Sequence, residues 1–229
     1  MARVKFGAMM VDARGKLGGH VFTKARSGAT IRTKVTPVNG QTASQGFVRN
    51  NLSTISQKWR TLSEDQRIAW NNLAASTGKT NVFGDTYYPS GKNLFTSVNI
   101  NILNSGNDII ENAPGKVELP LFTMAQPTVS VADGITLDLD YSGNPQACYV
   151  LVSASRPSSS GVFNFSGKHF QISVFPLIGT ISPQQLYGEY VAKFGTPALG
   201  QKISFTCRIV NSATGQVSAL QSQQTIVVE

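Results

Sequence analysis

The stretch TASQGFVRNNLSTISQKWRTLSEDQRIAWNNLAAST, residues 42–77, decides the fold of the first half of this chain. Thr42–Gln45 and Ser63–Gln66 each have the spacing of a capping box, in which a hydroxyl and an amide side chain satisfy two backbone N–H groups at the start of a helix. After each cap, apolar residues recur every three or four positions. The stretch therefore predicts two helices joined by a short link at Thr61-Leu62.

The apolar residues of these helices predict a small core. Val48, Leu52, Ile55 and Trp59 are spaced four, three and four apart, which places them on one face of the first helix. At helical spacing, aromatic side chains more often fill a core than stack on nucleic-acid bases. We therefore expect Trp59 and Trp70 to pack between the helices.

A third helix is expected to follow. Pro89-Ser90 is a suitable start, and Asn104-Ser105-Gly106 a suitable end, for a segment with apolar residues four apart: Leu94, Val98 and Ile102. We expect a helical domain at residues 42–106. The next segment, 107–120, holds two prolines and predicts a linker.

Residues 121–229 predict a β-sandwich of the fibronectin or immunoglobulin type, because short β-like runs alternate with turn signals. The predicted strand segments are 128–131, 135–141, 148–155, 169–175, 202–210 and 217–228. One helix interrupts them, with Ser182 as N-cap, Pro183 at its first position and Gly195 at its end. The predicted fold class is therefore α+β.

The two cysteines, Cys148 and Cys207, lie in β-like runs at a spacing similar to that of an immunoglobulin bridge. That pattern also expects a tryptophan between the cysteines, and both tryptophans lie elsewhere in this chain. We expect two small, buried and reduced residues.

Residues 1–41 predict an extended basic arm. The chain has 229 residues and a net charge of +8, but residues 1–34 alone hold eight basic side chains and one acidic one. Glycines oppose a helix here, and two short ribbons joined at Ser27-Gly28 are expected. Such an arm buries little of its own surface, so we expect something outside it to hold it in place.

The arm is the segment whose composition most calls for a partner. Its cations suit phosphates or an acidic protein surface, but the apolar residues between them need a protein groove, which favours protein over nucleic acid. The predicted partner-binding residues are Arg3, Lys5, Arg14, Lys16, Leu17, Val21, Phe22, Lys24, Arg26, Ile31, Arg32 and Lys34.

No pattern predicts an enzyme, a metal site or a cofactor. The chain has two histidines, His20 and His169, which excludes HExxH and His-rich metal motifs. Residues 161–168 resemble a phosphate loop but have five residues between the glycines instead of four, so we expect a hairpin loop. Asp138 and Asp140 alternate on a predicted strand and share a face, most simply a solvated one.

An ordered string of motifs runs through the first hundred residues: Gly15–Phe22, Ile31–Asn39, Gln41–Gln45, Arg49, Ser56–Leu62 and Gln66–Trp70. This string resembles an uncharacterised family of virion proteins from tailed phages and prophages, especially those associated with Bacteroidota. One departure is Gly40, which stands where the family pattern has proline and loosens the approach to the first helix. The β-rich half resembles the family less distinctly.

The resemblance implies a non-enzymatic, multi-copy structural protein of a tailed-phage virion. A sandwich domain with a self-contained core tolerates many surface contacts and suits repeated lateral packing, which favours the capsid surface or the head–tail neck. Its partners would be other copies of itself and capsid or portal/neck proteins, met in the cytoplasm of a bacterial host. No apolar run approaches the ~18 residues that span a membrane, and no secretory signal is visible. A tail component, and a DNA-binding or DNA-packaging protein acting through the arm, are the alternatives.

Overall fold

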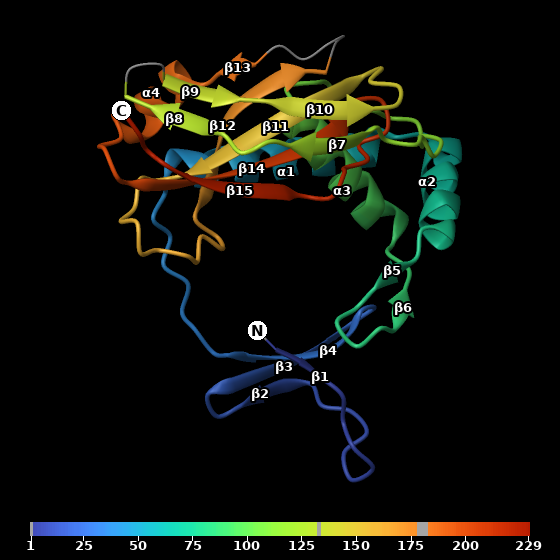
Figure 1. Cartoon of the computed structure of the whole chain (residues 1–229). Helices are drawn as coiled ribbons and strands as arrows, with labels where there is room; N and C mark the ends of the chain where they lie inside the picture. The colour runs from blue at the N-terminus through green and yellow to red at the C-terminus, as the bar shows by residue number, and fades with distance from the viewer. Residues whose placement is uncertain (1, 132–133, 178–182) are drawn as a thin grey trace. The chain divides into compact units, whose positions relative to one another are not determined.

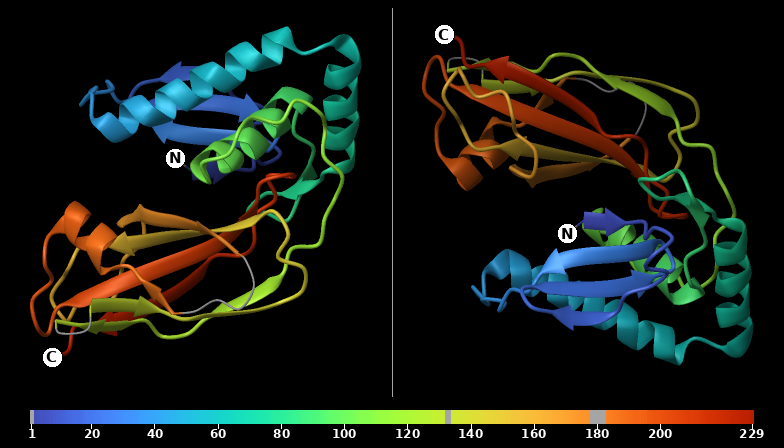
Figure 2. Two further views of the ribbon diagram at one scale, coloured as in Figure 1. Left: turned by 90° about the horizontal axis from the view of Figure 1, so that it is seen from above. Right: turned by 90° about the horizontal axis from the view of Figure 1, so that it is seen from below.

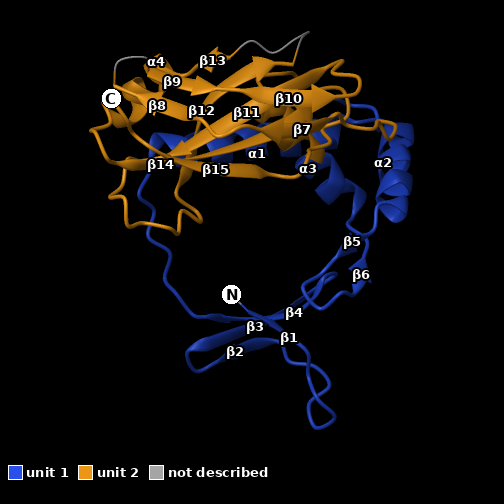
Figure 3. Cartoon of the chain, viewed as in Figure 1, with its two compact units in different colours: residues 1–97, 110–113 blue, residues 98–109, 114–229 orange. Residues whose placement is uncertain are grey.

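The computed structural model describes three stretches of the chain: residues 2–131, 134–177 and 183–229. Helices and antiparallel sheets give it the α+β fold class that the sequence predicts (Figure 1). Contacts divide the chain into two compact units (Figure 3), of which unit 1 is residues 1–97 with 110–113, and unit 2 is residues 98–109 with 114–229. The linker expected at 107–120 is thus shared between the units.

Unit 1 begins with a four-stranded antiparallel sheet, here called the arm sheet, in the order β1-β4-β3-β2. Its strands are β1 (Ala2–Val4), β2 (Gly15–Leu17), β3 (His20–Ala25) and β4 (Gly28–Thr33). The hairpin predicted at Ser27-Gly28 is present, and Gly28 has a φ of +112°, which side chains disfavour. The arm is more regular than an extended segment, because β1 and β2 pair with the two sides of this hairpin.

Both predicted capping boxes are present. Helix α1 (Ala43–Thr61) begins after Thr42, whose hydroxyl accepts from the Gln45 backbone N–H, and α2 (Glu64–Ser76) begins after Ser63 in the same way. Helix α3 (Gly91–Asn104) begins beside Ser90, whose hydroxyl accepts from the Asn93 backbone N–H at 3.3 Å. The helix starts are therefore encoded locally.

Aromatic side chains from all three helices form the core of unit 1. The fully buried ring of Trp70 meets Phe95 edge-on at 5.2 Å, and the half-buried Trp59 lies 5.3 Å from the same ring. This confirms both tryptophans as core residues. The predicted apolar face of α1 is only partly used: Ile55 is buried, but Val48 is 59% exposed and Leu52 46% exposed.

A two-stranded hairpin links α2 to α3. It consists of β5 (Lys79–Thr80) and β6 (Thr86–Tyr87). The start of α3 then passes close to α2. A Cβ at Gly91 would stand 2.9 Å from the backbone nitrogen of Asn71, so the approach of the two helices requires glycine here.

Unit 2 contains three antiparallel sheets, with strand orders β12-β11-β14-β15, β13-β9-β8 and β10-β7 (Figure 2). Their strands are β7 (Leu121–Met124), β8 (Thr128–Ser130), β9 (Gly134–Leu137), β10 (Leu139–Ser142), β11 (Cys148–Ser155), β12 (His169–Pro176), β13 (Gln184–Gln185), β14 (Lys202–Asn211) and β15 (Gln221–Ile226). Every predicted strand segment contains a strand. β7 and β13 were not predicted.

The core of unit 2 draws side chains from all three sheets. Leu137 on β9, Val152 on β11 and Met124 on β7 are buried in one cluster. Tyr190 packs into the same cluster, and its hydroxyl donates a hydrogen bond to the Ser155 carbonyl at 3.1 Å. Fully burying one such large apolar side chain contributes about 1.5–3 kcal/mol, so this cluster holds the sheets together.

The helix of unit 2 begins later than predicted. Helix α4 spans Tyr187–Phe194 and starts after Leu186, while Gln184–Gln185 forms β13 and pairs with β9. The predicted N-cap, Ser182, lies outside the described residues. Residues that the sequence assigns to the first turn of the helix are therefore part of the sheet. The end of α4 at Gly195 is as predicted.

The second half of α3 belongs to unit 2. Asn101 donates a side-chain hydrogen bond to the Gly215 carbonyl at 3.1 Å. Gly215 has a φ of +61°, and a Cβ there would stand 2.5 Å from a methyl carbon of Val98. The turn after β14 therefore fits against α3 only because residue 215 is glycine.

Cys148 and Cys207 are buried and free, as predicted. They lie on adjacent strands, where Cys148 pairs with Asn211 and Cys207 pairs with Val152. An offset of four residues corresponds to about 13 Å along a strand, well beyond the reach of a disulfide. The sheet register therefore rules out a bridge between them.

Candidate interaction surface

The structure brings the twelve predicted partner-binding residues together on the arm sheet and its turns. Eight lie in strands and four just outside them: Arg3 in β1; Lys16 and Leu17 in β2; Val21, Phe22 and Lys24 in β3; Ile31 and Arg32 in β4; and Lys5, Arg14, Arg26 and Lys34 in the adjoining turns. The sequence indicated that basic and apolar residues are interleaved along the chain. The sheet sorts many of them onto separate faces.

One face of the arm sheet is largely apolar. Phe22 pairs with Ile31, and residues directly opposite each other in antiparallel strands point to the same face. By the same alternation Val4 and Leu17 share this face, and the ring of Phe6 lies 6.5 Å from that of Phe22. Leu17 is 70% exposed. We call this surface the apolar face; it also includes His20 and Lys24.

The opposite face carries cations. Lys16 and Arg32 pair with Val21 from its two sides, which places all three in one row. Arg3 lies in the neighbouring row, beside Thr30. The aliphatic stems of Lys16 and Arg32 can cover Val21, which accounts for its low exposure of 8%. Val21 therefore supports this basic face and offers little surface of its own to a partner.

The segment at residues 81–89 holds one end of the arm sheet. Arg26 donates to the carbonyls of Tyr88 and Pro89 at 3.4 and 3.3 Å. Lys5 forms an ion pair with Asp85 at 3.0 Å. The hydrogen bond from Asn81 and, to a smaller extent, the one from Lys5 lower the pKa of Asp85, so its carboxylate stays charged. Two predicted partner-binding cations thus act within the chain, and the arm sheet is held partly by a segment of unit 1 that is distant in sequence.

A third internal contact ties down the β1–β2 connection. Asp12 forms ion pairs with Lys24 at 3.1 Å and with Arg14 at 3.6 Å. The hydrogen bond from Lys24 lowers the pKa of Asp12. Exposed ion pairs of this kind contribute little to stability, but they leave Lys24 and Arg14 less available to a partner than Lys16 or Arg32.

Further exposed apolar side chains lie in the first 52 residues, outside the predicted set. They are Met9, Met10, Val11, Val35, Val38, Phe47, Val48 and Leu52. Helical periodicity predicted that Val48 and Leu52 would be buried, and the structure shows that this prediction is wrong because both side chains are exposed. These side chains add exposed apolar surface to unit 1 beyond the twelve predicted residues.

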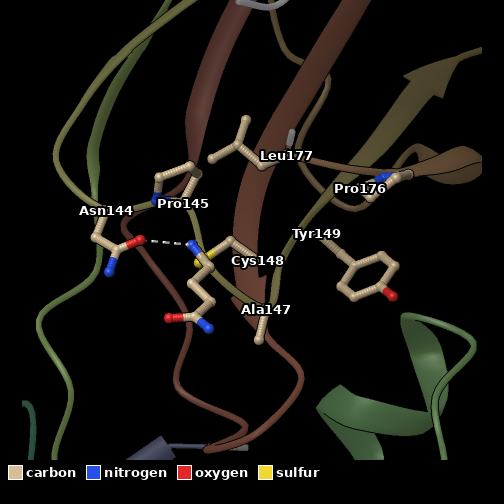
Figure 4. A pocket seen from close by; sticks show the side chains of 8 residues that line it. Asn144, Pro145, Ala147, Cys148, Tyr149, Pro176 and Leu177 are labelled. Atoms are coloured by element: carbon tan, nitrogen blue, oxygen red, sulfur yellow. Dashed lines mark hydrogen bonds between the residues drawn. The ribbon is translucent and has the colours of Figure 1, made fainter. Parts of the chain in front are cut away.

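Unit 2 has an open hollow of about 470 Å³ at one end of β11. Figure 4 shows Pro145 and Leu177 on one side of it and Tyr149 with Pro176 on the other. Burial raises the pKa of Cys148, which keeps the thiol protonated and a poor nucleophile. The hollow therefore offers apolar contact and no activated group for chemistry.

The other residues that the sequence analysis considered for chemistry lie in a loop or on strands of unit 2. Residues 161–168 lie in the loop that connects the paired strands β11 and β12, as predicted for a hairpin loop. His169 shares a hydrogen bond of 3.0 Å with the Ser204 hydroxyl, and burial lowers its pKa. Asp138 and Asp140 are both exposed. Over the described stretches, no three His, Cys, Asp or Glu side chains gather as a metal site would need.

Comparisons with known proteins give no relatives. No family model matches the chain, and no curated protein or solved structure matches it either. Among the described residues, no helix combines the length and the apolar character that crossing a membrane requires.

Proposed function

We propose that this protein is a non-enzymatic structural component of a tailed-phage virion, present in many copies and anchored to neighbouring subunits through its arm sheet. The observation that carries the proposal is the apolar face, on which Leu17 is 70% exposed. The resemblance of the motifs in residues 1–100 to tailed-phage virion proteins supplies the setting. The capsid surface or the head–tail neck is the position we favour, ahead of the tail.

The anchoring mechanism follows from the shape of the arm sheet. β1 and β2 are edge strands of three residues each, and each pairs on one side only. Their outer backbone groups suit addition to the sheet of a neighbouring subunit. Apolar contacts would then supply the affinity, since burying a Leu side chain contributes about 1.5–3 kcal/mol. Charge would mainly affect the rate and orientation of encounter.

Unit 2 is proposed to be a sandwich of the fibronectin or immunoglobulin class. If the strands are lettered A (β7 and β8), B (β9 and β10), C (β11), C′ (β12), E (β13), F (β14) and G (β15), the sheets read A-B-E and C′-C-F-G. This order supports the fibronectin-like arrangement. A self-contained core tolerates many surface contacts, which suits lateral packing between repeated copies.

The test compares two neighbouring side chains of β2 that point to opposite faces of the sheet. Leu17→Ala removes the exposed apolar anchor, and Lys16→Ala is its matched control from the basic face. Tagged full-length variants are expressed in the bacterial host, and their incorporation into density-purified phage particles is measured by quantitative blotting. Losing about 1.5–3 kcal/mol at each contact weakens binding by roughly 10–150-fold.

We expect Leu17→Ala to be depleted from particles while Lys16→Ala is incorporated like the parent chain. Circular dichroism confirms that both variants are folded. Normal incorporation of Leu17→Ala, or loss with Lys16→Ala alone, would show that the apolar face is not the anchor. If the parent chain itself is missing from purified particles, the virion assignment fails as a whole.

A further inference from the structure

Charge is divided unequally between the two units. Unit 1 holds fourteen basic and five acidic side chains, a balance of +9, and unit 2 holds six basic and seven acidic ones, a balance of −1. A domain with this excess of Lys and Arg has the electrostatic footprint of a polyanion-binding protein. The cationic character therefore belongs to the unit that contains the arm sheet.

Most acidic side chains of unit 1 form ion pairs with cations that lie outside the basic face. Asp12 pairs with Lys24 and Arg14, and Asp85 pairs with Lys5. The acids near the helices are paired in the same way: Glu111 with Lys58, and Glu64 with Arg67. Within the described stretches, no carboxylate lies within ion-pair distance of Lys16 or Arg32. Their charges are available to an external anion.

The sheet register spaces these cations across a firm surface. Arg3 and Arg32 are diagonal neighbours on adjacent strands, whose Cα atoms are about 7–8 Å apart. Lys16 lies two strands from Arg32, at about 10 Å. Thr23 and Thr30 hold the centre through a 2.7 Å hydrogen bond between their hydroxyls. The face thus presents separate positive charges in a fixed pattern.

We propose that the basic face of the arm sheet, through Lys16 and Arg32, binds the phosphate backbone of nucleic acid without reading its sequence. Arg3 in the neighbouring row donates to the Ser27 carbonyl and adds its positive charge to the same face. Exposed cations about 7–10 Å apart, with no carboxylate beside Lys16 or Arg32, suit a string of phosphates better than the mixed surface of a protein. Long cationic side chains position a backbone but carry no sequence information by themselves. The site goes beyond the proposed anchoring role, because it lies on the opposite face of the sheet from Leu17.

Two ligands can therefore be held at once. A protein subunit on the apolar face and nucleic acid on the basic face would not compete for the same side chains. The inference does not depend on which protein covers the apolar face, so the two proposals can fail separately.

The test measures binding of the full-length protein to a fluorescein-labelled 30-base-pair DNA duplex by fluorescence anisotropy between 50 and 300 mM NaCl. The variant is Lys16→Ala with Arg32→Ala. Each phosphate contact contributes about 0.9 to the slope of log K against log salt, so losing two contacts should lower that slope by roughly 1.8. At 0.1 M salt, binding should weaken by a factor of roughly 10–60. A second duplex of different sequence should bind equally well.

Two control variants isolate the basic face. Lys116→Ala with Lys168→Ala removes the same net charge from exposed positions in unit 2 and should leave the slope unchanged. Leu17→Ala changes the opposite face of the same strand and should also leave it unchanged. The charge-preserving pair Lys16→Arg with Arg32→Lys should restore both slope and affinity.

The proposal is overturned if Lys16→Ala with Arg32→Ala binds DNA with the parent slope, or if the unit 2 control reduces the slope equally. It is also overturned if that variant keeps its DNA binding but is lost from particles, because the basic face would then belong to an acidic protein surface. A loss of DNA binding with normal incorporation would leave both proposals standing.

Discussion

The aromatic core of unit 1 can be tested by replacing Trp70 with alanine. Trp70 is fully buried, meets Phe95 edge-on at 5.2 Å and donates its ring N–H to the Glu111 carbonyl at 2.8 Å. Truncating a buried aromatic side chain costs about 3–5 kcal/mol, and leaving the carbonyl without its donor costs about 1 kcal/mol more. Domains are stable by about 5–15 kcal/mol in total. Trp70→Ala should therefore remove most of the stability of unit 1.

The assay uses the location of the two tryptophans. Both lie in unit 1, so in Trp70→Ala the fluorescence of Trp59 reports on that unit alone. With a urea slope of about 1–3 kcal/mol per molar, a loss of about 4–6 kcal/mol should lower the unfolding midpoint by roughly 1.3–6 M. Trp70→Phe keeps an aromatic ring, loses the hydrogen bond, and should lose less than half as much stability.

An unchanged midpoint for Trp70→Ala would refute the packing argument. If that variant also failed to join particles, Trp70 would have to be an interface residue. Far-UV circular dichroism provides the internal control, because the β signal of unit 2 should persist at urea concentrations that unfold unit 1.

The cysteines and one glycine of unit 2 give two further predictions. Thiol titration in denaturant should find two free thiols, and finding none would contradict the sheet register. In the folded protein at pH 8, neither thiol should react readily, because burial raises the pKa of Cys207 to about 12 and also raises that of Cys148. Gly215→Ala should destabilise unit 2 by about 1–3 kcal/mol in chemical denaturation, because strain at a positive φ is added to overlap with Val98. Gly200→Ala, at a similar φ of +76° but with no atom within 4 Å of the added carbon, is the matched control and should cost less.

Local signals in the sequence predicted the elements of this fold well. Both capping boxes, the Ser27-Gly28 turn and the strand segments depend on residues close together in the chain, so their physics can be read from short windows. Helix α4 shows where such signals fail. Pro183 and Gln185 favour a helix start, but Gln184–Gln185 pairs with β9, almost fifty residues earlier in the chain. A non-local pairing overrides a local preference there.

The candidate site could be predicted by composition but not by geometry. The charge of residues 1–34 singled out a segment that the structure gathers into one sheet, since all twelve predicted residues lie on the arm sheet or its turns. The two faces follow from pairing Arg3 with Thr30 and Lys16 with Val21, and no local pattern specifies those registers. Exposure of Val48 and Leu52 was missed for a related reason: periodicity identifies a shared helix face but not whether another element covers it.

The internal contacts of the arm change what a partner has to supply. The sequence suggested that an arm with so little burial needs an external surface to become ordered. Strand pairing satisfies the backbone within the arm sheet, and Arg26 and Lys5 attach one end of it to residues 81–89. Ordering of a backbone costs about 1–2 kcal/mol per residue, so a pre-formed sheet spares a partner much of that cost. The exposed apolar side chains can then contribute to affinity directly, which is the advantage of anchoring through a sheet instead of a flexible tail.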